Sequence, residues 1–377
     1  MKNSSPRHRE PRVLIWVLLI AACALLLFRA VRLAHAEPPP PHGLLIYSID
    51  VEGGQSTLLV GPTGASLLVD TGWRSFGGPP GRDAERIQTA MKDAGIDHID
   101  KVMITHYHVD HVGGVPELVK RVKVGEFLDH GPNREDSDIT RYDYAAYLKA
   151  IGSTPRRTLR PGDTIDLSPL GSGPVRGDPD VPGLSIVVLT ADGDHIDKVP
   201  GVKPEVNSDC AGEPKWELDA SENPRSVGIL VRYGNFSFLD MGDLTKAKEI
   251  PLVCPMNLIG RVDLFLVSHH GMDWSNSTAF VNAIAPRVAI MPNGAHKGGS
   301  PEAWERVHAS PRLQDLYMLH TAEGADAAHN SAEELIANPK GTTAPDGQYF
   351  KVVAQAGGSF SVTNSRTGQT KDYPEGK

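Results

Sequence analysis

The chain has 377 residues, 40% of them hydrophobic, which is enough to build a sizeable core in a globular domain. Its formal net charge of −8 disfavours tight nonspecific binding to nucleic acid, because an acidic surface repels a polyanion. No internal repeat of fixed period is visible, which argues against a solenoid or a propeller.

Residues 1–36 have the pattern of an export signal. Four basic residues among the first twelve precede an unbroken apolar run over residues 13–28, and residues 34–36 supply a small-x-small cleavage site. Two arginines follow the run, so an uncleaved membrane anchor stays open, and the stretch ending at Cys23 also resembles a lipoprotein acylation site. We therefore expect a periplasmic or secreted domain, or one anchored to the outer face of the cytoplasmic membrane.

A Pro-rich linker, residues 37–43, follows the signal. Removal of residues 1–36 takes away six basic side chains and one acidic one, so 38 basic and 46 acidic residues become 32 and 45, a net charge of −13. We expect no strong binding to nucleic acid, and contact with a membrane only through an uncleaved N-terminal segment.

The next elements predict a mixed α/β domain. Apolar runs indicate strands at residues 44–49, 57–60 and 65–69, and residues 84–94 have the single apolar face of an amphipathic helix. A short buried strand, Val102-Met103-Ile104, then leads into the most informative stretch of the sequence.

The stretch Thr105-His106-Tyr107-His108-Val109-Asp110-His111 carries three imidazoles and a carboxylate within six residues. An extended backbone directs His106 and His108 to the same side, whereas Asp110 and His111 lie on a turn that can face a second position nearby. This ligand set suits zinc or a similar borderline metal ion. A His-rich surface loop is the simpler alternative, but the position at a strand end favours a metal site.

Further strands and helices follow this stretch. Helices are predicted at residues 115–122, 142–151, 279–284 and 302–307, and strands at residues 124–128, 164–167, 184–189, 226–233, 236–239, 262–267, 288–291, 350–354 and 359–363. Residues 190–225 show no periodicity, and an irregular segment of this length is usually functional or disordered. We expect it to fold over the site.

Cys210 and Cys254 are the only cysteines that remain after the signal. In an oxidising compartment an even pair is more often a disulfide than two free thiols. We therefore predict a disulfide that ties residues 190–225 to the segment after Asp243.

The histidine-rich stretch resembles the H-x-H-x-D-H signature of the metallo-β-lactamase superfamily. Residues 49–56 and 67–72 resemble its opening strands, closest to the branch that contains the extracellular domain of the DNA-uptake protein ComEC. The resemblance runs from about Leu44 to Leu319. It implies a four-layer αββα sandwich, a hydrolase domain at residues 44–330, and a C-terminal extension at residues 331–377 with a terminal β-hairpin.

The same resemblance implies two metal ions, Zn²⁺ in the first instance, with Mn²⁺ or Fe²⁺ as alternatives. His106 and His108 would bind the first ion, and Asp110 and His111 would bind the second. Asp243, which follows a predicted hairpin, would bridge both ions.

Three further residues take supporting or alternative roles by resemblance. A histidine after the strand at residues 262–267 would complete the second ion's ligands, with His269 preferred and His270 as the alternative. Asp70 would support the metal loop by hydrogen bonding, although a simple turn-forming aspartate fits the sequence equally well.

The third ligand of the first ion is where this sequence departs from the family. Many members have a Pro-Gly-His sequence where this chain has Thr190-Ala191-Asp192-Gly193-Asp194-His195. His195 is a candidate ligand, Asp192 or Asp194 could replace it through oxygen, and His130 is a weaker candidate. A solvated His195 is the alternative, in which case the first ion is held more weakly than the second.

The sequence thus predicts an exported hydrolase in which a metal-activated water attacks an ester, amide or phosphodiester bond of a small-molecule or similar substrate. Asp110 would be catalytic and orient the nucleophile. A ComEC-like phosphodiesterase or nuclease stays open but should have a basic cleft. A redox member would favour iron and usually carries Glu at the position of His108, and a non-catalytic metal-binding protein would be expected to lose ligands.

Overall fold

The computed structural model describes residues 43–75, 78–167, 183–341 and 347–376. The predicted signal and all but the last residue of the predicted linker lie outside the described residues. Residues 42–377 form one compact unit. In the part of the chain that is described, no helix has both the length and the apolar character needed to cross a membrane.

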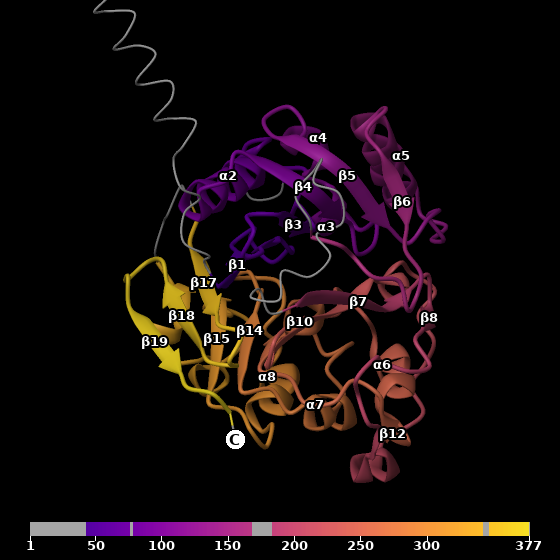
Figure 1. The fold of residues 1–377 in the computed structure, drawn as a ribbon, viewed down its shortest axis with the longest axis vertical. Coiled ribbons are helices and arrows are strands. Elements are labelled where there is room, and N and C mark those ends of the chain that lie inside the picture. Colours follow the sequence, from indigo (N-terminus) through magenta and orange to yellow (C-terminus); the bar gives the residue numbers. More distant parts are fainter. Residues whose placement is uncertain (1–42, 76–77, 168–182, 342–346, 377) are drawn as a thin grey trace, which may run out of the picture. The chain divides into compact units, whose positions relative to one another are not determined.

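Within the described residues, nine strands form the first sheet, in the order β19-β18-β17-β1-β2-β3-β4-β5-β6 (Figure 1). They are β1 (Leu44–Ile49), β2 (Thr57–Val60), β3 (Ser66–Val69), β4 (His98–Met103), β5 (Lys123–Asp129), β6 (Arg156–Thr158), β17 (Tyr349–Ala354), β18 (Phe360–Asn364) and β19 (Thr370–Tyr373). In this order, each pair of neighbouring strands from β19 to β3 is antiparallel, whereas each pair from β3 to β6 is parallel.

The second sheet has eight strands in the described ranges, in the order β16-β15-β14-β13-β11-β10-β7-β8. They are β7 (Leu184–Ala191), β8 (Asp194–His195), β10 (Gly228–Tyr233), β11 (Phe236–Asp240), β13 (Leu264–Leu266), β14 (Val288–Met291), β15 (Asp315–His320) and β16 (Ile336–Asn338). Neighbours from β11 to β16 are parallel. A separate small ladder pairs β9 (Glu205–Val206) with β12 (Met256–Asn257).

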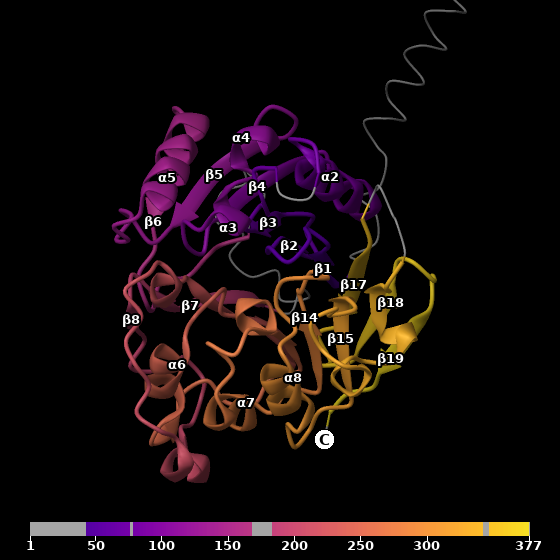
Figure 2. The ribbon, with the colours of Figure 1, turned by 180° about the vertical axis from the view of Figure 1, so that it is seen from behind.

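Helices cover the outer face of each sheet, as Figures 1 and 2 show. Their bounds are α2 (Arg82–Ala94), α3 (Val109–Val112), α4 (Val115–Leu118), α5 (Asp138–Ile151), α6 (Lys246–Val253), α7 (Thr278–Ile284) and α8 (Pro301–His308). Short 3-10 helices are η1 (Ser208–Gly212), η2 (Asn223–Arg225), η3 (Ser268–Gly271), η4 (Ala327–His329) and η5 (Glu333–Leu335). Helices α2 to α5 pack on the first sheet and α6 to α8 on the second.

Alternation along the strands builds three apolar cores from these layers. In β1, Leu44 and Ile46 face the core between the sheets, while Leu45 and Tyr47 face the core under α2 to α5. Successive side chains of a strand point to opposite faces of its sheet. An apolar strand therefore contributes both to the core between the two sheets and to the core between its sheet and the helices. The four-layer αββα sandwich expected from the sequence is confirmed.

The last part of the chain differs from the expectation. Residues 331–377 are not set apart as an extension, because β16 joins the second sheet and β17 pairs with β1 along six residue pairs. The edge of β1 would otherwise expose unpaired backbone groups, and the terminal hairpin covers it.

Two local predictions are wrong, and one helix was not predicted. The strand expected at residues 164–167 forms only an isolated bridge between Thr164 and Val187, and the helix expected at residues 115–122 ends at Leu118. Helix α6 was not predicted, since Pro251 lies inside it and proline normally interrupts a helical pattern.

Candidate metal centre

The candidate site is formed by loops that follow four strands. Asp70 follows β3, residues 104–114 follow β4, residues 241–243 follow β11, and residues 268–271 follow β13 closely. β3 is parallel to β4, and β11 is parallel to β13, so the carboxyl ends within each pair lie at one edge. Side chains from distant parts of the sequence therefore meet there.

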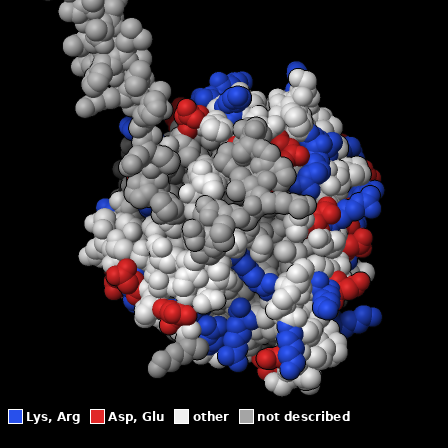
Figure 3. Space-filling model, in the orientation of Figure 1, with Lys and Arg blue, Asp and Glu red and all other residues white. Residues whose placement is uncertain are grey.

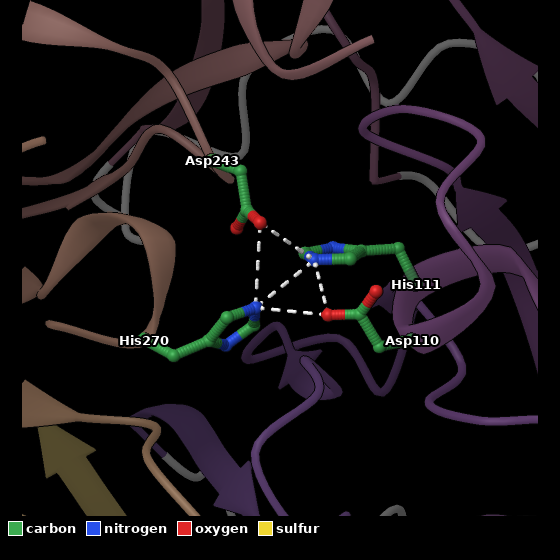
Figure 4. Close-up of side chains that lie close together, drawn as sticks. All are labelled: Asp110, His111, Asp243 and His270. Atoms are coloured by element: carbon green, nitrogen blue, oxygen red, sulfur yellow. Dashed lines mark hydrogen bonds and ion pairs between the residues drawn. The ribbon is translucent and has the colours of Figure 1, made fainter. Parts of the chain in front are cut away.

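Four side chains converge at this position, as Figure 4 shows: Asp110, His111, Asp243 and His270. Each offers one ligand atom, and these atoms lie within 4.8 Å of one another. His270 Nε2 is 3.1 Å from Asp110 Oδ2, and His111 Nε2 is 3.3 Å from the same oxygen. Two imidazoles and two carboxylates that converge in this way form a donor set suited to zinc or a similar ion.

Asp243 lies at the centre of a wider group of histidines. Its Oδ2 is 3.2 Å from His111 Nε2 and 3.4 Å from His270 Nε2. The same oxygen is 3.5 Å from His269 Nε2 and 3.8 Å from His106 Nε2. One carboxylate oxygen thus faces histidines that the resemblance assigns to different ions, as expected of a bridging ligand.

Hydrogen bonds fix the orientation of two of the rings. Asp70 Oδ2 is 2.7 Å from His111 Nδ1, so Nε2 of that ring faces the cluster. His106 Nδ1 is 3.1 Å from Thr105 Oγ1 and 3.5 Å from Ser226 Oγ, which directs its Nε2 inward. Thr105 donates to Asp70 from its backbone N–H at 2.8 Å and from its hydroxyl at 2.7 Å. Asp70 therefore holds both the loop and a ligand ring.

Two buried ligand atoms lack the partners that buried polar atoms usually have. Among the described residues, His106 Nε2 and Asp243 Oδ1 have no hydrogen-bond partner. An unpaired buried polar atom costs about 1–3 kcal/mol, and both atoms border the cluster. A bound metal ion would satisfy them, so the residues present fit the ions that the sequence predicts.

Burial and close charges set the ionisation of the cluster. Burial would raise the pKa of Asp110, but Lys297 and His111 hold that pKa well below its usual value. Burial acts on Asp243 in the same way, and nearby histidines hold its pKa well below its usual value too. Burial lowers the pKa of His106, and neighbouring histidines lower it further. Ionised carboxylates and a neutral imidazole are the forms that bind metal ions.

The structure places His270 in the cluster rather than His269, which the sequence analysis preferred. His269 Nδ1 is 3.2 Å from Ser275 Oγ, and the two histidine rings are 6.1 Å apart and inclined by 71°. Both residues have positive φ, 56° and 55°, a left-handed conformation that side chains rarely adopt. Only His270 belongs to the four-residue cluster, so the preference for His269 is corrected to His270 there, although His269 Nε2 also lies 3.5 Å from Asp243 Oδ2.

His106 and His108, the residues expected to hold the first ion, lie side by side with ring centroids 4.7 Å apart. His108 Nε2 is 2.8 Å from Glu135 Oε2, which leaves Nδ1 as its ligand nitrogen. The hydrogen bond with His108 lowers the pKa of Glu135 to about 2. A carboxylate on the second nitrogen is a common support for a metal-binding histidine. Sequence reasoning missed Glu135, because it lies on a loop with no motif.

The candidates considered for the first ion's third ligand lie elsewhere. In the part of the chain that is described, His195 and Asp194 are exposed on β8 and do not join the cluster. His130 Nε2 is 2.7 Å from the buried carboxylate of Glu222, and Asp192 is 2.6 Å from an arginine side chain. The solvated alternative for His195 therefore agrees with the structure.

Lys297 is a functional candidate to which the sequence analysis gave no role. Its ammonium contacts Asp110 Oδ2. The loop that carries it is held against His270, since the Gly299 N–H donates to His270 O at 2.9 Å. A Cβ on Gly298 would lie 2.1 Å from the same oxygen. The run Lys297-Gly298-Gly299 is the sequence signal, because only glycine fits so close to the backbone of a ligand.

Comparison with protein families agrees with this geometry. A family model described as the metallo-beta-lactamase superfamily matches residues 50–296, a range that holds every residue of the cluster. The chain belongs to the metallo-beta-lactamase superfamily. The superfamily that the histidine-rich stretch led us to expect is therefore confirmed.

Curated relatives match a shorter part of the chain. Lactamase-like protein nscB of Trichophyton rubrum is 31% identical over 115 residues, 30% of this chain and 33% of that protein. Atrochrysone carboxyl ACP thioesterase dmxR1 of Cryptosporiopsis sp. is 30% identical over 115 residues, again 30% and 33%. Thioesterase pkgB of Emericella nidulans is 32% identical over 113 residues, 30% and 31%. The chain spans about a third of the length of these relatives.

Solved structures resemble this one only distantly. The diiron beta-hydroxylase CmlA from Streptomyces venezuelae has a TM-score of 0.38 and 15% identity, and the match covers 72% of this chain and 47% of that chain. A metallo beta lactamase from Hirschia baltica has a TM-score of 0.28 and 14% identity, covering 73% and 85%. Scores this low carry no argument about function.

Proposed function

We propose that the chain is an exported hydrolase with two zinc ions, which cleaves an ester or thioester bond of a small acyl substrate. The observation that carries the proposal is the cluster of Asp110, His111, Asp243 and His270, bordered by the unpaired His106 Nε2. The chemistry that such ions supply when bound is activation of a water molecule and polarisation of the bond that is cleaved.

Asp110 is the catalytic residue in this proposal. The contacts from His111, His270 and Lys297 are all made to its Oδ2. Oδ1 is therefore left to accept a hydrogen bond from the attacking water and to orient it for attack. The ammonium of Lys297 places a fixed positive charge at Asp110 Oδ2, and in this proposal it stabilises negative charge that develops on the substrate.

Two observations support an acyl substrate over a nucleic acid. Two of the relatives are named as thioesterases. Basic and acidic side chains are interspersed on the face shown in Figure 3, and the chain without residues 1–36 has a net charge of −13. The alternative, a ComEC-like phosphodiesterase or nuclease, rests on the motif resemblance and would need a continuous basic groove for a polyanion.

Export is part of the same proposal. It is supported by the basic start and apolar run of residues 1–36, and by a disulfide between Cys210 and Cys254, a bond that persists in oxidising compartments. Mass spectrometry of the N-terminus in fractionated cells provides the test. A cytoplasmic chain that retains Met1 contradicts export, whereas an intact membrane-bound chain supports the anchored alternative.

The test of the activity is metal removal followed by a substrate panel. The purified chain is stripped with a chelator, reloaded with Zn²⁺, Mn²⁺ or Fe²⁺, and assayed on a 4-nitrophenyl ester, an acyl thioester, a lactone, a β-lactam and a phosphodiester. We expect cleavage of the ester or thioester only after metal is restored. Fastest cleavage of the phosphodiester would favour the ComEC-like alternative. A chain that binds no metal would exclude the proposal.

A further inference from the structure

Besides the bridging Asp243, the first ion has only His106 and His108 as assigned protein ligands, and Asn223 has an atom to offer. Asn223 is only 7% exposed, and its side-chain Oδ1 is buried without a hydrogen-bond partner among the described residues. Buried amide oxygens are normally satisfied, because leaving one unpaired costs free energy. The described protein atoms supply no hydrogen-bond donor to this oxygen, so it is free to bind another partner.

The segment after Asn223 runs beside the loop that carries His106. The Val227 N–H donates to Thr105 O at 2.9 Å, and Ser226 Oγ is 3.5 Å from His106 Nδ1. The Ser226 hydroxyl also accepts from the backbone N–H of the bridging residue Asp243, at 3.2 Å. The chain three residues beyond Asn223 is thus in contact with His106 and with the backbone of the bridging carboxylate.

The residue before Asn223 is tied to His108. The Glu222 N–H donates to Glu135 Oε2 at 3.0 Å, and the same oxygen is 2.8 Å from His108 Nε2. Glu222 Oε2 accepts from the N–H of Tyr107, the residue between the two histidines, at 3.4 Å. Along the chain, Asn223 therefore lies between Glu222, which contacts the Glu135 partner of His108, and Ser226, which contacts His106.

The backbone of Asn223 is held in place while its side-chain oxygen is free. Its N–H donates to Ser221 Oγ at 3.2 Å, its carbonyl accepts from the Ser226 N–H at 3.1 Å, and Pro224 fixes the next φ. We propose that Oδ1 of Asn223 is a further protein ligand of the ion held by His106 and His108, in addition to the bridging Asp243. This proposal rests on the two-metal part of the proposed function.

An amide oxygen as ligand predicts that the metal position at His106 and His108 differs in affinity and metal preference from the cluster of Asp110, His111, Asp243 and His270. An amide oxygen is neutral and hard, and such oxygens suit Mn²⁺ better than they suit zinc. The cluster of Asp110, His111, Asp243 and His270 offers two carboxylates and two imidazoles, and it should hold its ion more tightly. The position at His106, His108 and Asn223 should bind more weakly and should accept Mn²⁺ readily.

The experiment counts metal ions rather than turnover. The full chain is stripped of metal and titrated with MnCl₂, free Mn²⁺ is followed by electron paramagnetic resonance, and bound metal is counted by mass spectrometry. We expect two equivalents in the wild type. Asn223→Ala should retain the more tightly bound Mn²⁺ equivalent, and its affinity for the second equivalent should fall by roughly 10- to 100-fold. Asn223→Asp should bind it at least as tightly as the wild type, since a carboxylate adds charge.

Two further variants show which metal position is lost in Asn223→Ala and whether the loss is specific. His108→Ala should lose the same equivalent as Asn223→Ala. Asn257→Ala serves as the matched control, because Asn257 is another buried asparagine, but its oxygen accepts from the Ile259 and Gly260 N–H groups at 3.0 and 2.9 Å. It should lower the melting temperature of the metal-free chain and keep both equivalents. Asn223→Ala should leave that temperature unchanged.

The outcomes separate this proposal from the proposed function. Two equivalents with wild-type affinity in Asn223→Ala, or loss of different equivalents in Asn223→Ala and His108→Ala, would overturn the role of Asn223 alone. A wild type that binds one equivalent would overturn it as well, and would leave a hydrolase with a single ion. A wild type that binds none would overturn both.

Discussion

A histidine has two ring nitrogens, and at His111 and His108 a neighbouring carboxylate decides which one is left for an ion. Asp70 occupies Nδ1 of His111, so Nε2 is free, whereas Glu135 occupies Nε2 of His108, so Nδ1 is free. The two rings are thus presented through opposite nitrogens. Supports of this kind usually change metal affinity by about 10- to 100-fold when they are lost.

The first prediction concerns Asp110, which in the proposed function both binds an ion and orients the nucleophile. Asp110→Ala should abolish detectable hydrolysis and release the more tightly held ion, because Oδ2 leaves the cluster and Oδ1 no longer orients the attacking water. Metal counting and the ester assay measure the two effects. His195→Ala is the control, since His195 is exposed on β8, and it should keep metal content and turnover unchanged. A fall in either would show that His195 reaches an ion.

Part of this site follows from sequence and part of it does not. The stretch from His106 to His111 is local, and its spacing alone indicates a metal site at a strand end. Lys297 and Asn223 come to the site only through the packing of distant loops, more than 100 residues along the chain. Their residue types are common in ordinary loops, so no pattern in one sequence separates them from the rest.

At the scale of single elements, the loop from Gly294 to Gly299 fixes the positions of His270 and of the Lys297 ammonium. Gly294 N–H donates to Lys297 O at 2.9 Å, and the Gly299 N–H donates to His270 O at 2.9 Å. Gly298 has a φ of +77°, and its Cα faces the carbonyl of His270. The loop therefore holds the backbone of His270 through its carbonyl and brings the Lys297 side chain to Asp110.

The second prediction follows from this loop. Gly298→Ala places a Cβ where the His270 carbonyl lies, 2.1 Å away, at a φ that side chains avoid. The loop or His270 must shift, and we expect affinity for the tighter ion to fall by roughly 10- to 100-fold. Gly324→Ala is the matched control, because no atom lies within 4 Å of its added Cβ among the described residues. Equal metal affinities in the two variants would contradict the positioning role.

The third prediction concerns the disulfide between Cys210 in η1 and Cys254 at the end of α6. The bond joins the irregular segment to the helix that follows Asp243, across a separation of 44 residues. A double serine variant should lose about 2–4 kcal/mol of unfolding free energy. Hydrogen exchange should rise more in residues 205–215 than in the strands. Thiol labelling of the unreduced, denatured wild type should find no free cysteine beyond Cys23.

At the scale of the whole molecule, polar contacts join the two sheets beside the site. Gln55 Nε2 in the β1–β2 connection donates to both oxygens of Asp240 at the end of β11, at 3.1 and 3.0 Å. Asp50, after β1, pairs with His320 at the end of β15, at 2.7 Å. The sandwich itself was predictable from the resemblance of the histidine-rich stretch to the metallo-β-lactamase superfamily. These cross-sheet pairs were not, because they depend on how the two sheets are placed.

The last prediction uses the pair of Asp50 and His320, both buried, with Arg86 as a second partner of Asp50 at 3.0 Å. Burial would lower the pKa of His320, but Asp50 raises it above its ordinary 6.5. Burial would raise the pKa of Asp50, but His320 and Arg86 lower it below 3.8. The pair therefore stabilises the fold fully between about pH 4 and 6.5. This contribution declines as the pH rises through the raised pKa of His320.

His320→Gln should accordingly cost about 1.5–3 kcal/mol of unfolding free energy at pH 6, and less at pH 9, where the wild-type histidine has also lost its charge. Urea unfolding of both proteins at the two pH values measures the difference. His195→Gln, at an exposed position that makes no ion pair within the described residues, should show no dependence of this kind. A cost for His320→Gln that is equal at pH 6 and pH 9 would mean that the ring acts as a neutral hydrogen-bond donor and that its charge does not help to join the sheets.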